Sequence, residues 1–180
     1  MRKLDYEVAQ NLDGDEPVPF TPHVQRSIGM SERRIKSPGT SDTAFSKGSL
    51  GAALRAGGAV CRAVDAVVNG ENRNAFCVVR PPGHHAGVNG LEDGAHSCGF
   101  CIFNSVAIGA MHALDRHRGN GVERVAIVDF DIHHGNGTEE IVKVSPVCVC
   151  VHVCVCVCVC DCALTRSLPS SPVPRAIQLQ

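Results

Sequence analysis

The stretch RVAIVDFDIHHGNGTEE, Arg124 to Glu140, decides the fold of this chain. An apolar run, Val125 to Val128, is followed by alternating carboxylates and apolar residues, then by two histidines and Gly-Asn-Gly. In an extended segment alternate side chains share a face, so Asp129, Asp131 and His133 point the same way. A carboxylate and an imidazole at positions i and i+2 can bind one cation, and this donor set suits zinc or iron. The pattern predicts a strand that ends in a metal site.

Taken alone, these letters also fit a polar turn, since acidic residues and Gly-Asn-Gly are common in loops. A second cluster, RPPGHHAG from Arg80 to Gly87, favours the metal site. It too follows a short apolar run, Ala75 to Val79, and places two histidines at the end of a predicted buried strand. Adjacent histidines project differently, so one can face a reacting centre while the other supports it. His84 and His85 are therefore candidates for general acid-base catalysis.

Helical and strand-like segments alternate along the chain. Apolar residues recur at helical spacing from Lys47 to Asn69 and from Asn104 to His117, with Asn104 or Ser105 as the N-cap of the second helix. The first helix should cover a sheet. Its glycines at 57 and 58 either allow close packing on a neighbour or weaken its middle. This alternation predicts an α/β domain with a parallel sheet and a site beyond the carboxyl ends of its strands.

Composition limits the partners and the compartment. With 180 residues and a net charge of -1, the chain can form one domain with a core and lacks the charge of a polyanion-binding surface, so we expect no direct nucleic-acid binding. The first residues contain no apolar signal-peptide core, which predicts a protein that is neither secreted nor membrane-bound. Seven of the eleven cysteines lie in one stretch near the end. The other four are typical of reduced intracellular thiols: Cys61, Cys77, Cys98 and Cys101.

Three blocks of this sequence resemble the zinc-dependent histone deacetylases of the arginase-deacetylase superfamily, nearest the class II type. The blocks are RPPGHHAG, CGFCIFNSVAIGA from Cys98 to Ala110, and VDFDIHHGNGT from Val128 to Thr138. The match covers about Ser41 to Val144. It implies a partial three-layer α/β fold with a mostly parallel sheet and a missing C-terminal half. The implied segments are a poorly ordered extension (residues 1–40), the N-terminal part of a deacetylase domain (41–146) and a non-family tail (147–180).

The resemblance also implies a zinc site and a substrate tunnel. Asp131 and His133 correspond to two of the family's three zinc ligands. Gly99 and Phe100 correspond to the Gly-Phe pair that lines the acyl-lysine tunnel. By approximate spacing, Asp42 falls where the family has a rim carboxylate that holds the substrate backbone. The implied partner is an acetylated histone or another acetyl-lysine protein, within a corepressor complex, in the nucleus or cytoplasm.

The chemistry that the resemblance implies is amide hydrolysis. His84 and His85 correspond to the family's catalytic histidine pair, with Asp129 orienting the first histidine and Asn136 close to the second. Zinc would polarise the acetyl carbonyl and acidify a water, and His85 would take the proton as this water attacks. Asp129 would fix the tautomer of His84 and raise its basicity.

The family pattern ends at Val144. Residues 147–160 read VCVCVHVCVCVCVC, which a GT dinucleotide repeat would encode, with GTG giving Val and TGT giving Cys. We interpret this tail as a read-through of non-coding sequence or a gene-model error. A buried strand that fills the family's next strand position is one alternative. Binding of soft metals by the thiols is another, although the spacing is not that of a zinc ribbon.

Two family groups have no counterpart in a matching context: a second Asp ligand for zinc, and the Tyr or His that stabilises the transition state. The single Tyr of the chain is Tyr6, and after the HHGNGT block the only Asp and the only His are Asp161 and His152. We therefore expect weakened zinc binding and an inactive or nearly inactive chain. Two hypotheses follow, a fragment of a lysine deacetylase and a non-catalytic remnant that binds a partner.

Overall fold

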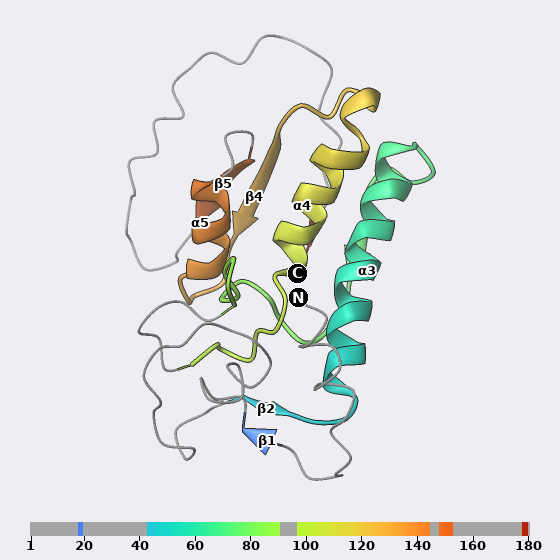
Figure 1. Ribbon diagram of the computed structural model, residues 1–180. Coiled ribbons are helices and arrows are strands. Elements are labelled where there is room, and N and C mark those ends of the chain that lie inside the picture. Colours follow the sequence, from blue (N-terminus) through green and yellow to red (C-terminus); the bar gives the residue numbers. More distant parts are fainter. Residues whose placement is uncertain (1–17, 20–42, 91–96, 145–147, 153–177, 180) are drawn as a thin grey trace.

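The computed structural model describes residues 18–19, 43–90, 97–144, 148–152 and 178–179 (Figure 1). Several sequence predictions fall on residues outside these ranges. They include most of the 1–40 extension, the rim residue Asp42, and most of the Val-Cys repeat. Tyr6 and Asp161 also lie outside the described residues.

Helix α3, Ser49–Val68, is the longest helix and confirms the helix predicted between residues 47 and 69. It runs without interruption through both glycines. Gly57 is buried, and a Cβ there would lie 3.6 Å from Cδ1 of Ile108 in the neighbouring helix, whereas Gly58 faces open space. Gly57 therefore allows close packing between helices. The apolar stripe of α3 was predicted to cover a sheet. It packs against the strand at residues 76–77 and also against the neighbouring helix, so the prediction named only one of its two partners.

Helix α4, Ser105–Arg116, lies beside α3 (Figure 1). Its N-cap is Asn104, as predicted, and the Asn104 side chain accepts a hydrogen bond from the backbone N–H of Ala107 at 3.0 Å. A side-chain oxygen at this position satisfies one of the amide groups that a helix start leaves without a partner. After α4, a short 3-10 turn, η2 (Arg118–Asn120), leads toward the central strand.

Strand β4, Val125–Asp129, pairs in parallel with β5, Cys148–His152, from Val125↔Cys148 to Asp129↔His152. Helix α5, Asn136–Lys143, connects them. The main core cluster joins α4, β4 and α5 through four buried residues, Ala110, Leu114, Ile127 and Val142. Because side chains alternate along a strand, Ala126 and Val128 point away from this core, and both are exposed. Only one face of β4 is covered by the described helices.

The remaining described strands are short. Strand β3 is only Phe76–Cys77 and pairs in parallel with β6, Gln178–Leu179. Strand β1, Val18–Pro19, pairs antiparallel with β2, Ala44–Phe45. Within the described residues these are separate two-stranded ladders, so the continuous parallel sheet expected from the sequence is not found.

The run from Ala75 to Val79 is also less buried than predicted. Cys77 packs against Val60 and Ala63 of α3, but Val78 is 86% exposed, because α3 covers only one face of this segment.

None of the described helices is both long and apolar enough to cross a membrane. Even α3, with 20 residues, carries Arg55, Arg62 and Asp65 along its length.

Candidate active site

The loop that carries His84 and His85 is docked onto the start of α5. The backbone N–H of Thr138 donates to the carbonyl of His84 at 3.0 Å, and Ala86 N–H donates to Gly83 O at 2.9 Å within the loop. Gly137 lies against the backbone of this loop, where a Cβ would collide with the carbonyl carbon and oxygen of Ala86. The two sequence motifs therefore meet backbone to backbone.

Each of the two histidines has a partner of its own. His84 Nδ1 lies 2.9 Å from Asp129 Oδ2, and His85 Nδ1 lies 2.7 Å from Asn136 Oδ1. The hydrogen bond to Asp129 raises the pKa of His84 above its usual value. An amide oxygen only accepts, so the contact with Asn136 places the proton of neutral His85 on Nδ1. The Nε2 atom of His85 is then the nitrogen that can accept a proton.

The predicted metal ligands lie next to this pair. Asp131 Oδ1 accepts from the backbone N–H of His133 at 2.7 Å and lies 2.9 Å from His133 Nδ1. The backbone hydrogen bond is the main reason why the pKa of Asp131 falls below its usual value. The rings of His133 and His85 have centroids 6.2 Å apart. Both ligand side chains are exposed, at 48% for Asp131 and 69% for His133.

This donor pair fits a zinc ion. Neighbouring ligand atoms of a tetrahedral zinc site with bonds near 2 Å are separated by roughly 3.3 Å. The 2.9 Å between Asp131 Oδ1 and His133 Nδ1 is close to that separation. Both atoms can therefore reach one ion after a small displacement.

A buried amide connects three parts of the site, and the sequence reasoning missed it. Asn104 Nδ2 donates to Ala86 O at 3.1 Å and to Thr138 Oγ1 at 2.9 Å. Asn104 and Thr138 are 5% and 1% exposed. Asn104 was predicted only as an N-cap, and no role was predicted for Thr138. The only hint in the sequence was that Asn104 and Thr138 are polar residues in two blocks that lie far apart along the chain.

Gly99 and Phe100 lie beside His85. Gly99 has φ +52°, and a Cβ there would collide with Cδ2 of the His85 ring. Phe100 has φ +64°, donates its backbone N–H to Thr43 Oγ1 at 3.0 Å, and is 52% exposed. The positive φ at Gly99 is one that glycine adopts readily. Lining of a substrate tunnel by this pair stays a prediction.

Cys101 lies against the loop that carries His84 and His85. Its thiol accepts a hydrogen bond from the backbone N–H of His85 at 3.5 Å. The side chain is buried, and burial raises the pKa of the thiol to about 11. Cys101 is therefore protonated at neutral pH and is not a nucleophile.

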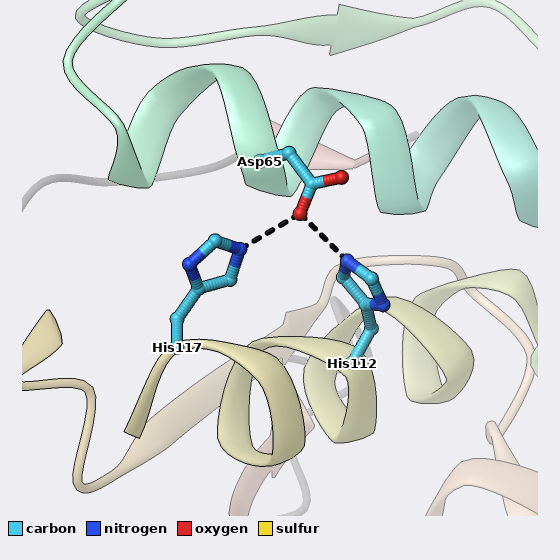
Figure 2. Close-up of side chains that lie close together, drawn as sticks. All are labelled: Asp65, His112 and His117. Atoms are coloured by element: carbon cyan, nitrogen blue, oxygen red, sulfur yellow. Dashed lines mark hydrogen bonds and ion pairs between the residues drawn. The ribbon is translucent and has the colours of Figure 1, made fainter. Parts of the chain in front are cut away.

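A second group of potential metal ligands lies between α3 and α4 (Figure 2). His112 Nε2 and His117 Nε2 each lie 2.7 Å from the same oxygen, Asp65 Oδ1. Among the residues that the structure describes, this is the one group of three His, Cys, Asp or Glu side chains positioned to hold a metal ion. The sequence reasoning missed it because its members occur singly, two within helices and His117 at a helix end, outside any motif.

Comparison with known proteins identifies one family. The family model described as "Histone deacetylase domain" matches residues 17–153. Type-2 histone deacetylase 1 of Dictyostelium discoideum is 52% identical over 100 residues, which are 56% of this chain and 6% of that protein. Histone deacetylase 6 of Caenorhabditis elegans is 46% identical over 99 residues, 54% of this chain and 9% of that protein.

A protein named as a polyamine deacetylase and a solved structure are also similar to this chain. The human protein named Polyamine deacetylase HDAC10 is 44% identical over 77 residues, 43% of this chain and 10% of that protein. The crystal structure of the HDA15 HD domain matches with a TM-score of 0.53 and 37% identity, covering 62% of this chain and 29% of that one. The chain thus spans only a small part of the length of these relatives.

Proposed function

Because this chain belongs to the histone deacetylase family, we propose that its two motif loops serve the zinc-dependent hydrolysis of acetyl-lysine amides on histones or other proteins. One observation carries the proposal. The His84-His85 pair is anchored through Nδ1 on both rings and lies beside the Asp131-His133 pair of oxygen and nitrogen donors. A proton acceptor and a potential cation site are thus adjacent, an arrangement that metal-dependent amide hydrolysis uses.

Asp131 and His133 would hold the zinc ion. Bound zinc supplies a Lewis acid that polarises the acyl carbonyl and makes a water molecule more acidic. Within the described part of the chain, no third carboxylate or imidazole completes a three-ligand group with this pair. We therefore propose that this chain alone binds zinc weakly at this position and turns over slowly or not at all.

His85 would act as the general base. Asn136 Oδ1 accepts from Nδ1–H of His85, so that Nε2 takes the proton from the attacking water. Asp129 favours the protonated form of His84, and in that form the ring would place a positive charge beside the negative charge that develops on the acyl oxygen. General acid-base groups of this kind typically contribute about 10²- to 10⁴-fold to the rate.

The wider predictions belong to the same proposal. We propose the N-terminal part of the family's three-layer fold over residues 41–146, with Gly99 and Phe100 along the acyl-lysine path and Asp42 at its rim. Acetylated proteins of the nucleus or cytoplasm are the expected substrates. One relative is named a polyamine deacetylase, so acetylated polyamines are the alternative substrate class to compare.

Zinc content and turnover of an acetyl-lysine peptide and an acetylated polyamine, measured side by side, test the proposal. His85→Gln should keep the zinc and lower any turnover by about 10²- to 10⁴-fold, because it removes only the base. The double variant Asp131→Asn, His133→Gln should lose both zinc at this position and turnover. Turnover that is unchanged in His85→Gln, or that persists without Asp131 and His133, would contradict the proposal.

A further inference from the structure

We propose that Asp65, His112 and His117 form a second zinc site, separate from the motif residues, that ties α3 to the end of α4 (Figure 2). Asp65 comes from the last third of α3, His112 from within α4, and His117 is the C-cap of α4. The three side chains converge from two helices on one point between them. None of them belongs to the motif loops described above.

The distances are those of a site that zinc could enter with little rearrangement. One ligand atom from each of the three residues lies within 4.8 Å of the other two, and each Nε2 is 2.7 Å from Asp65 Oδ1. Tetrahedral zinc ligands are separated by roughly 3.3 Å, so each imidazole would retreat from the oxygen by about 0.6 Å. Two imidazoles and one carboxylate, with a fourth position for water, are a donor set that zinc commonly takes.

The protons can be accounted for. In the hydrogen-bonded arrangement both Nε2 atoms carry a proton directed at Asp65. When zinc binds Nε2, the proton of each neutral imidazole moves to Nδ1, so no net proton is taken up. For His117 this requires an acceptor at Nδ1, where Asn120 Nδ2 now lies 3.1 Å away. Rotation of the Asn120 amide presents its oxygen instead, and Asn120 becomes a positioning residue for the metal-bound ring.

Two of the three ligand side chains are partly exposed, which would allow an ion to enter the site. The His117 side chain is 8% exposed, whereas those of His112 and Asp65 are 22% and 32% exposed. The inner ligand is thus held by packing, and the outer two open toward solvent. Such a site keeps its geometry and still admits an ion and a water molecule.

The site would stabilise the contact between the C-terminal ends of α3 and α4. His117 begins the turn η2, which leads to β4, and the motif residues follow the opposite end of β4 (Figure 1). Zinc at this joint would link α3 and α4 on the side away from the histidine loop. Its expected effect is on stability, with no direct part in chemistry.

The test measures zinc bound per molecule of this 180-residue chain, in a background of Asp131→Asn, His133→Gln that removes the motif pair. Asp65→Asn is the matched variant, because its amide oxygen still accepts from both imidazoles but the anionic ligand is gone. His112→Gln removes the more exposed of the two imidazoles in this site. Asn120→Ala, which leaves all three ligands in place, should weaken zinc affinity by about 10- to 100-fold.

We expect the background protein to bind one more zinc than Asp65→Asn or His112→Gln, and histidine ¹⁵N spectra to show zinc on Nε2 of residues 112 and 117. Zinc should also raise the Tm of the background protein but not that of Asp65→Asn. Equal zinc content in all variants would overturn the proposal, because the cysteine-rich stretch or another group would then hold the metal. Histidine spectra that do not change with zinc would overturn it as well.

Discussion

At the end of β4, His84 and His85 each direct Nδ1 to a partner of their own, whereas between α3 and α4 His112 and His117 direct Nε2 to one shared oxygen. Anchoring through Nδ1 leaves the outer nitrogen of a ring for a substrate or a water. Anchoring through Nε2 uses that nitrogen to hold two helices together. The same residue type thus forms a candidate catalytic pair in one place and a structural joint in the other.

The largest expected effect comes from the amide that supports the first group. Asn104→Ala removes an N-cap and leaves Ala86 O and Thr138 without their donor, so it should lower the free energy of unfolding by about 2–4 kcal/mol. Denaturant unfolding measures this loss.

Asn104→Ser is the matched control, because a serine hydroxyl also caps a helix start while the amide donors are removed and no charge is buried. It should therefore be intermediate. A cost below about 1 kcal/mol for Asn104→Ala would mean that the cap alone matters and that the loop does not depend on the amide.

A smaller effect is expected where the backbone meets His85. Gly99→Ala introduces a Cβ at φ +52° against the His85 ring, and should cost about 1–3 kcal/mol. The ring signals of His85 should shift in the same variant, because the side chain must move. Gly119→Ala is the control, since its Cβ would meet nothing within 4 Å. If both variants unfold alike, Gly99 does not position His85.

The two groups should also respond to pH in opposite directions. The pKa of His84 is raised from 6.5 by its hydrogen bond to Asp129, so its contribution to stability is complete below pH 6.5 and is lost as the pH rises through the folded-state value. Asp129→Asn should remove this dependence and cost about 1 kcal/mol at pH 6. NMR titration of His84 checks it, and an unchanged pKa in the variant would show that Asp129 is not the cause.

The smallest effect is expected at Asp65 without metal. Hydrogen bonds from His117 and His112 lower the pKa of Asp65 below 3.8, so its contribution is complete above pH 3.8 and is lost as the pH falls through the folded-state value. The Asp65 side chain is 32% exposed, so solvent screens its ion pairs in part, and Asp65→Asn should cost less than about 1 kcal/mol at neutral pH. Unfolding curves of the metal-free protein at pH 3 and pH 7 provide the measurement. A much larger loss at neutral pH would mean that the shared oxygen is a major support of the helix pair.

Local patterns predicted local structure well. The period of the apolar residues located α3 and α4, and the apolar run Val125 to Val128 located β4, with the polar loop after it. The pairing of His84 with Asp129 and of His85 with Asn136 was expected from the family resemblance, and the structure has both contacts. Their catalytic roles remain a proposal.

Features that depend on packing could not be predicted in the same way. The link from Asn104 to Ala86 and Thr138 joins residues that are 18 and 34 positions apart. Asp65 meets His117 across 52 positions, and nothing near either residue indicates the other. The exposure of Val78 depends on which face of its segment is covered by a helix. The separation of β3 from β4 depends on which strands pair. An apolar run in the sequence specifies neither.

The parallel pairing of β4 with β5 has a genetic consequence. Strand β5 lies in the Val-Cys repeat, in which valine and cysteine alternate except at His152. A shift of two residues would again pair alternating valine and cysteine with β4, with only the position of the histidine changed. If a GT repeat encodes this stretch, one Val-Cys unit corresponds to three dinucleotide repeats, and gain or loss of one unit would still leave β4 a strand partner of alternating valine and cysteine.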